Sequence, residues 1–370
     1  MKKIIGFYLI LFTSQVLKGQ EPFSCSSFTL SSGDTVVYGR NHDATLRNCL
    51  IVFNPKNIYK EGFEFLNEIN PKWTSKYSSL TFNVLGVGFA VCGMNEKGLA
   101  IGHMGFSEAQ YPDKDKRPVL DQIQYITYVL DNCASTKDVI KTAKRIRISD
   151  ESSTKEHYFI CDKSGQYAII EFIKGEMILY TNKSMPYPLL SNDNYSKSLS
   201  YLQKYQGFGG DKPVPERTFG VEEIMAIGCN YIKQYESFKP GGIIKTSLDL
   251  LNDIGFNKYP PPDTINVSKD YGTQFSAVFD LKNLRVYFNT RSNQTIRIIE
   301  FQKFIPNCLE STKILEADYD ATGIVNNSFS TYTLEKNRDY LTNRLSKVDG
   351  MPKELIDFLA NYPESFKCKK

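Results

Sequence analysis

The residue with the clearest capacity for chemistry is Cys25, because a thiolate can attack a carbonyl carbon and form an acyl-thioester. Cysteine nucleophiles often use a histidine as their base, and the chain has three histidines: His42, His103 and His157. Alternation along an extended segment would place His42 on the opposite face from Asn41 and Asp43, and nothing in the sequence places it near Cys25. His103 is expected to be a packed or surface histidine. A free α-amino group is another suitable base, since its ordinary pKa is about 7.7–8.0. That mechanism requires Cys25 to be the first residue of the mature chain.

The segment before Cys25 is typical of an exported protein. Two lysines precede a short apolar run over residues 4–12, which predicts a secretory signal peptide over residues 1–20. The apolar run is too short to span a bilayer comfortably. Cleavage at its end would leave residues 21–24 as a short stub before the thiol. We therefore expect a secreted or periplasmic protein whose stub is removed in a further step.

Composition argues against several other classes of function. The chain has 370 residues, a formal net charge of +4 and no block of like charges, so nothing favours binding to nucleic acid or to an acidic membrane surface. Its eight cysteines form no CxxC pair, so the sequence predicts neither a zinc site nor a dense disulfide framework, and no cofactor is expected. We expect buried free cysteines together with one or two bridges.

Clusters of hairpins separated by helices predict an α+β fold with largely antiparallel sheets. The first hairpin joins residues 25–30 to 35–38, so Cys25 begins a strand. Further hairpins are expected over residues 84–91 with 99–104, 157–161 with 167–172, and 275–281 with 284–290. Helices are expected over residues 120–130, 135–146, 195–205, 220–235, 334–345 and 353–359. Residues 25–370 are expected to form a single domain with a helical C-terminal extension from about residue 331.

Several motifs together resemble one family. Cys25 at the start of a hairpin, Tyr-Gly-Arg-Asn-His-Asp at 38–43 and Gly-Met-Asn-Glu-Lys-Gly-Leu at 93–99 look like the choloylglycine hydrolase and penicillin V acylase family of N-terminal-nucleophile amidases. Similar segments follow: Pro-Leu-Leu-Ser-Asn at 188–192, Pro-Glu-Arg-Thr-Phe at 215–219 and the hairpin over 273–288. The resemblance covers residues 25 to about 299 and implies a four-layer αββα sandwich that hydrolyses linear, non-peptide amides.

The resemblance also implies roles for individual side chains. Cys25 would attack the amide carbonyl, and its own amine would take and return the proton. Asp43 would hold that amine, while Arg40 beside the thiol would favour the thiolate. Asn192 would donate a side-chain N–H to the oxyanion, and Arg217 would support the same pocket electrostatically. The expected partner is a small-molecule N-acyl amide with an apolar acyl group, and neither a cofactor nor a membrane span is expected.

The sequence does not decide which groups donate hydrogen bonds to the oxyanion, and two positions show why. Gly105 stands where relatives often have an asparagine or tyrosine lining the site, so it offers a backbone N–H but no side-chain donor. Asn182 competes with Asn192, which is preferred because a Pro-Tyr-Pro segment precedes it and a helical pattern follows it. The stretch from Asn192 to Arg217 is short for a bile-salt hydrolase, so neither bile-salt specificity nor a tetramer follows. The sequence leaves open whether the protein forms a homo-oligomer.

Alternative functions also stay open at the level of sequence. An acyltransferase or ceramidase-like enzyme would share the acyl-enzyme and differ only in the acceptor. A non-catalytic lipoprotein anchored through Cys25 is the alternative from another class, although Pro22 occupies the position where lipoprotein signals prefer an aliphatic residue. In that case Arg40 and Asp43 would be an ion pair at the end of a strand. A free amine or a lipid adduct on Cys25 would separate the two classes.

Overall fold

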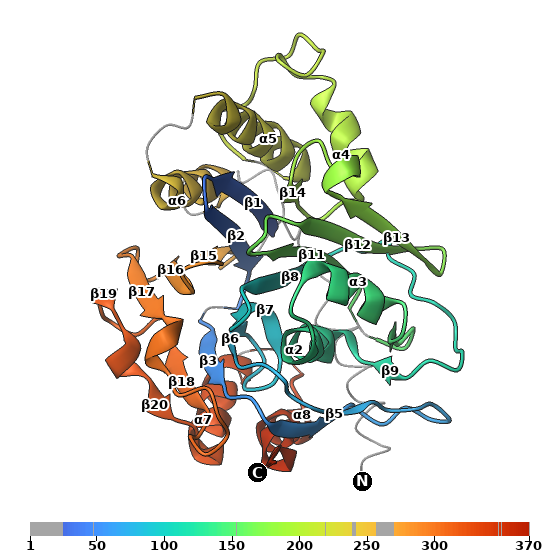
Figure 1. Cartoon of the computed structure of the whole chain (residues 1–370), viewed down its shortest axis with the longest axis vertical. Coiled ribbons are helices and arrows are strands. Elements are labelled where there is room, and N and C mark those ends of the chain that lie inside the picture. The colour runs from blue at the N-terminus through green and yellow to red at the C-terminus, as the bar shows by residue number, and fades with distance from the viewer. Residues whose placement is uncertain are drawn as a thin grey trace.

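A computed structural model describes residues 25–46, 48–152, 154–218, 220–238, 242–256, 270–346, 348 and 350–369. The signal peptide and stub that the sequence predicts over residues 1–24 lie outside these ranges. Within them, two large β-sheets form the centre of the molecule, and helices lie against their outer faces (Figure 1).

The first large sheet contains the N-terminal hairpin. Its strands, in spatial order, are β14 (Leu189–Leu190), β1 (Ser26–Ser32), β2 (Thr35–Ala44), β15 (Gly272–Asp280), β16 (Arg285–Thr290), β17 (Arg297–Glu300) and β19 (Gly323–Ile324). β1 and β2 form the predicted hairpin, which turns at Gly33 with a φ of 56° that glycine adopts at little cost. β15 pairs antiparallel with β2, although more than two hundred residues of sequence separate them. The outer face is covered by α5 (Val221–Phe238) and α6 (Ile243–Ile254), with α4 (Tyr195–Leu202) beside α5.

The second large sheet is longer. Its strands, in spatial order, are β13 (Glu176–Thr181), β12 (Tyr167–Ile173), β11 (Glu156–Asp162), β8 (Leu99–Gly105), β7 (Ala90–Asn95), β6 (Ser79–Asn83), β3 (Leu50–Asn54), β18 (Lys313–Glu316) and β20 (Ser330–Thr331). Its outer face carries α2 (Gln122–Asn132) and α3 (Thr136–Ala143) over one part, and α7 (Leu334–Leu345) and α8 (Lys353–Asn361) over another. Two small sheets complete the fold: β9 (Val119–Leu120) with β10 (Arg147–Ile148), and β4 (Ile58–Glu61) with β5 (Lys72–Thr74) and β21 (Lys367–Cys368).

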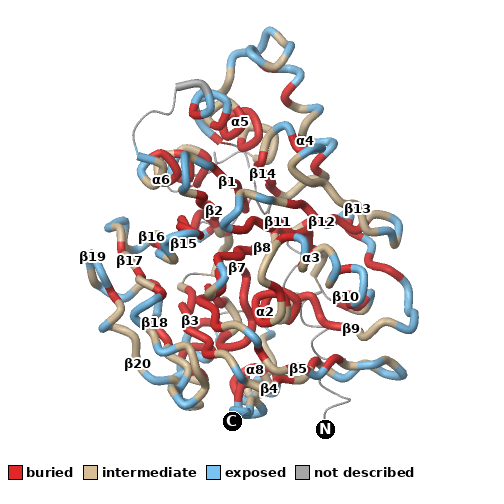
Figure 2. Tube along the Cα trace, viewed as in Figure 1, coloured by how far each residue is buried: buried red, intermediate tan, exposed pale blue. Residues whose placement is uncertain are grey.

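Side-chain alternation along the strands creates the layers. In β2, Val36 and Tyr38 point into the core between the two sheets, whereas Val37 packs under α5 and α6. The middle core is rich in aromatic rings, such as Phe82 stacked on Phe275 with centroids 4.8 Å apart. Figure 2 shows that the central strands are almost continuously buried, as expected for sheets covered on both faces. The arrangement is the four-layer αββα sandwich that the sequence predicted.

One predicted strand was misplaced. The sequence indicated a strand over residues 84–91, but β7 runs from Ala90 to Asn95 and pairs with β8, while the segment before it forms turns. Gly86 and Gly88 have φ of 80° and 98°, a conformation that interrupts a strand. The apolar residues in that segment pack beneath α7 and α8 rather than in a ladder, which explains why their hydrophobicity misled the prediction.

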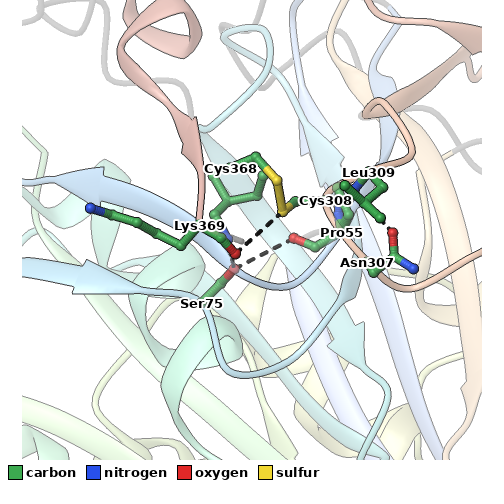
Figure 3. Close-up of a disulfide and its surroundings, with 8 residues drawn as sticks. Pro55, Ser75, Asn307, Cys308, Leu309, Cys368 and Lys369 are labelled. Atoms are coloured by element: carbon green, nitrogen blue, oxygen red, sulfur yellow. Dashed lines mark hydrogen bonds between the residues drawn. A yellow bond between two sulfur atoms is a disulfide. The ribbon is translucent and has the colours of Figure 1, made fainter.

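The cysteines match the expected mixture of free thiols and a bridge. Cys308 and Cys368 form a disulfide, and the other six cysteines are free and buried. Figure 3 shows this bridge joining the loop around Asn307 to the C-terminal strand β21, which pairs with β4. The C-terminal segment is therefore held both by strand pairing and by a covalent link. No helix in the described ranges combines the length and apolar character needed to cross a membrane.

Candidate active site

Cys25 lies at the open end of the N-terminal hairpin, where three strands bring other residues to its thiol. It directly precedes β1, and its side chain is only 5% exposed in the core between the sheets. Sγ accepts a hydrogen bond from the backbone N–H of Asp43 at 3.4 Å, and it lies 3.7 Å from the carbonyl oxygen of the same residue. The thiol is therefore fixed against the last residues of β2 rather than exposed to solvent.

His42 lies beside the thiol, and the expectation that it would not was wrong. Its Nδ1 is 3.9 Å from Cys25 Sγ, and its ring stacks on Phe275 with centroids 5.1 Å apart. Ser26 pairs with Asn41 across the hairpin, so the next pair in the ladder is Cys25 with His42. Alternation along β2 alone could not reveal this neighbour, but counting the register outward from the Gly33 turn would have done so. Burial, ahead of the nearby Arg40 charge, lowers the pKa of His42 well below its usual value and favours the neutral imidazole.

Arg40 is a fully buried cation with no hydrogen-bond partner in the part of the chain that the structure describes. None of its three guanidinium nitrogens is paired among the described residues, and its side chain is 0% exposed. Such burial costs several kcal/mol unless a partner compensates it. Burial raises the pKa of the Cys25 thiol to about 11, and the charge of Arg40 is the strongest influence lowering it. This direction of influence agrees with the role that the resemblance implied for Arg40, which stays a prediction.

Only one of the two carboxyl oxygens of Asp43 has a hydrogen-bond partner among the described residues. Its Oδ1 accepts a hydrogen bond from the Thr273 hydroxyl of β15 at 2.6 Å, whereas its buried Oδ2 has no partner among the described residues. Burial raises the pKa of this carboxyl to about 7, although the Thr273 hydrogen bond and the Arg40 charge oppose the shift. A positively charged donor placed against Oδ2 would stabilise the carboxylate. Thr273 is a supporting residue that the sequence did not reveal, because it lies 230 positions further along the chain.

Asn192 and Gly105 meet at the same end of the hairpin. β14 pairs with β1 through Ser27 and Leu190, and continuing that register places Asn192 opposite Cys25. The Ser191 hydroxyl confirms the approach by donating to the Cys25 carbonyl oxygen at 2.9 Å. Asn192 Nδ2 donates to the Gly105 carbonyl at 2.8 Å, so the two predicted oxyanion positions are in direct contact.

The other two candidates lie in different surroundings. Asn182 uses its side chain within a turn: it accepts from the Tyr167 N–H at 2.9 Å and donates to the Gly165 carbonyl at 3.0 Å. This is a structural role, which supports the choice of Asn192. Arg217 is exposed in the loop that precedes α5, and its electrostatic role in the pocket stays a prediction. Among the described residues, no group of side chains is arranged to hold a metal ion.

Comparison with known proteins identifies the family. The family of linear amide C–N hydrolases, choloylglycine hydrolase family, matches residues 25–229, more than half of the chain, and the match begins at the buried thiol. The chain belongs to this family. It is therefore a hydrolase of linear amide C–N bonds, as the sequence motifs predicted. The chain is also 25% identical over 262 residues to penicillin V acylase from Pectobacterium atrosepticum, a match that covers 63% of this chain and 68% of the relative.

Solved structures support the same fold. Penicillin V acylase from Agrobacterium tumefaciens superposes with a TM-score of 0.70 at 21% identity, covering 84% of this chain and 98% of the other. A variant of conjugated bile acid hydrolase from Clostridium perfringens gives a TM-score of 0.65 at 19% identity, covering 82% and 99%. At these identities the likeness establishes the αββα architecture and does not by itself assign a substrate.

Proposed function

We propose that this linear-amide hydrolase acts through an acyl-thioester on Cys25, which is the first residue of the processed and exported chain. The observation that carries the proposal is that two buried ionisable side chains near the thiol, Arg40 and Asp43, lack partners for some of their polar atoms among the described residues. Arg40 is buried without a hydrogen-bond partner and Asp43 Oδ2 is buried without a donor, among the described residues. A thiolate and a protonated α-amine on Cys25 would complete both.

The chemistry divides into two balanced steps. In the first, the α-amine takes the proton from Sγ, the thiolate attacks the amide carbonyl carbon, and the C–N bond breaks as the proton passes to the departing amine. In the second, the amine takes a proton from water, hydroxide attacks the thioester carbonyl, and the C–S bond breaks. The acid leaves and the proton returns to Sγ. Because burial outweighs the Arg40 charge and leaves the pKa of the thiol raised to about 11, the base is needed at neutral pH.

The neighbouring residues have separate tasks in these steps. Arg40 stabilises the thiolate, and Asp43 orients and stabilises the α-ammonium. The second N–H of Asn192 Nδ2 and the backbone N–H at Gly105 are the proposed donors to the oxyanion that forms in each step. Arg217 is proposed to add positive potential at the same pocket. His42, with its neutral imidazole 3.9 Å from Sγ, is proposed to lie beside the bound acyl group.

The substrate is proposed to be a small N-acyl amide with an apolar acyl group. Apolar and aromatic side chains, including Phe82, Met104 and Phe275, form the core that contains the thiol, and this apolar environment supports the proposal of an apolar acyl group. The names of the relatives agree with this class, since penicillin V acylase and conjugated bile acid hydrolase are both named for amide substrates. The charged and apolar pattern of residues 1–20 supports export.

Mass spectrometry and kinetics test this proposal together. The mature protein should have the mass of a chain that begins at Cys25, and acid quenching during turnover of an N-acyl amide should trap an acyl adduct on that residue. Cys25→Ala should abolish hydrolysis, whereas Cys161→Ala, at another buried thiol of the same core, should leave kcat within about threefold of the parent. An active enzyme that retains residues 21–24 would refute the amine mechanism, and a diacylglyceryl adduct on Cys25 would indicate a membrane anchor instead.

A further inference from the structure

His157 is a fully buried histidine that the proposed reaction does not use. It lies on β11, and its Nε2 is 2.6 Å from the carbonyl oxygen of Ser191. A carbonyl oxygen can only accept, so Nε2 carries a proton and donates it. The other ring nitrogen, Nδ1, is 3.2 Å from Oε1 of Glu171 on β12, which is also fully buried. The imidazole therefore links a buried carboxyl group to the residue that directly precedes Asn192.

Glu171 holds the other side of the same segment. Its Oε1 accepts the backbone N–H of Tyr195 at 2.8 Å, and its Oε2 accepts Nδ2 of Asn194 at 2.6 Å. Together with the bond from His157 to Ser191, three hydrogen bonds from two buried side chains fix the turn that carries Asn192.

His157 also contacts the opposite half of the oxyanion site. The ring of Phe106 stacks on the imidazole with centroids 4.9 Å apart and an interplanar angle of 20°. Phe106 follows Gly105, whose carbonyl accepts the hydrogen bond from Asn192 Nδ2. One side chain thus touches a neighbour of each proposed oxyanion donor, on two segments that are distant in sequence.

We propose that His157, held by Glu171, is a positioning residue that sets the Asn192 amide and the Gly105 backbone at the distance required for the oxyanion. This inference rests on the proposed function. Oxyanion donors are effective only when they are fixed in advance, and a displacement of about 1 Å can cost two orders of magnitude in rate. His157 itself contacts neither the thiol nor the substrate; it acts through Asn192.

A double-mutant cycle tests this role. His157→Phe keeps a flat ring against Phe106 but removes both hydrogen bonds, and it should lower kcat by about 10- to 100-fold with KM nearly unchanged. In the Asn192→Ala background the same substitution should cost less than about threefold, because the donor that His157 positions is already absent. His157→Gln, which can still donate an N–H to Ser191, should recover part of the lost kcat.

The control is a second buried polar network, centred on Asp131 of α2, which covers the outer face of the second large sheet. Asp131 accepts from Lys60 at 2.8 Å and from the indole N–H of Trp73 at 2.7 Å, with both charged side chains almost fully buried. Asp131→Asn should lower the melting temperature but leave kcat within about threefold. If Asp131→Asn reduced kcat as strongly as His157→Phe, a general loss of stability would explain both effects and the positioning role would be refuted.

The outcomes separate this inference from the proposed function. If Cys25→Ala removes activity while the losses from His157→Phe and Asn192→Ala multiply, only the positioning role fails. If Cys25→Ala retains activity, the proposed function itself fails. If His157→Phe does not fold, Glu171→Gln replaces it in the same cycle, because the amide keeps the shape of the carboxyl group. Independent effects of Glu171→Gln and Asn192→Ala would likewise overturn the proposal.

Discussion

Replacing Asn192 by alanine should separate a catalytic amide from a structural one. The half-buried side chain of Asn192 makes one hydrogen bond from Nδ2, to the Gly105 carbonyl at 2.8 Å, and Nδ2 has a second N–H. Loss of the bond to Gly105 should lower the free energy of unfolding by about 1 kcal/mol. If the second N–H binds the oxyanion, its loss should raise the activation free energy by about 2.7–4 kcal/mol, which is roughly a hundred- to a thousandfold in kcat.

The same reasoning predicts how the loss divides between the kinetic constants. The oxyanion exists only in the tetrahedral species, so Asn192→Ala should reduce kcat and kcat/KM together and change KM little. Initial rates with an N-acyl amide, measured over a range of concentrations, give both constants. Thermal unfolding of the same preparations gives the change in stability.

Asn182→Ala is the matched control for this experiment. Asn182 makes two hydrogen bonds in its turn, to the Tyr167 N–H and the Gly165 carbonyl, so its loss should cost about 1–2 kcal/mol of stability. It should leave kcat within about twofold of the parent, since its amide is committed to the turn. A collapse of kcat in Asn182→Ala with normal turnover in Asn192→Ala would show that the oxyanion donor has been misassigned.

Three further predictions concern the charged groups at the site and the C-terminal bridge. Arg40→Met should shift the alkylation of the Cys25 thiol by iodoacetamide to higher pH without lowering the melting temperature, because it removes both the charge that favours the thiolate and an unpaired buried cation; a lower pH midpoint would contradict this. In chain that retains residue 24, verified by mass, the raised pKa of Asp43, about 7, means that this carboxyl contributes most to stability at low pH and that its contribution falls as pH rises from about 4 to 7, by up to about 1.4 kcal/mol per pH unit. Asp43→Asn should reduce the slope of stability against pH over this range, as measured by urea unfolding, and an unchanged slope would refute the assignment. Reducing the Cys308–Cys368 bridge, which closes a loop of 60 residues, should cost up to about 4 kcal/mol of stability yet leave kcat unchanged, as unfolding with and without dithiothreitol would show.

The family resemblance could assign roles to Cys25, Arg40 and Asp43 because these residues belong to one short hairpin whose motif is continuous in sequence. Cys25 directly precedes β1 and Arg40 lies on β2, and a tight turn joins these two strands, so both residues belong to a strand–turn–strand pattern that spans few residues. The antiparallel sheets and most helices followed in the same way, since hydrophobic periodicity is a property of neighbouring residues. Asn192 was chosen through the resemblance of its segment to a family motif. Only the structure shows that the competing Asn182 uses its side chain within a turn.

Long-range strand pairing decided the rest. The contact between His42 and the thiol depends on the register of the hairpin, which places His42 opposite Cys25. The hydrogen bond from Thr273 to Asp43 depends on the pairing of β15 with β2, which brings together residues 230 positions apart. The hydrogen bonds from His157 and Glu171 to the turn that carries Asn192 likewise depend on long-range packing. They require β11 and β12 of the second large sheet to lie against the segment that follows β14 of the first. Sequence periodicity states which face of a strand is buried, but it does not state which distant strand lies beside it. The thiol and its charged neighbours could therefore be identified from the sequence, whereas the hydrogen bonds that hold them in position are products of the tertiary structure.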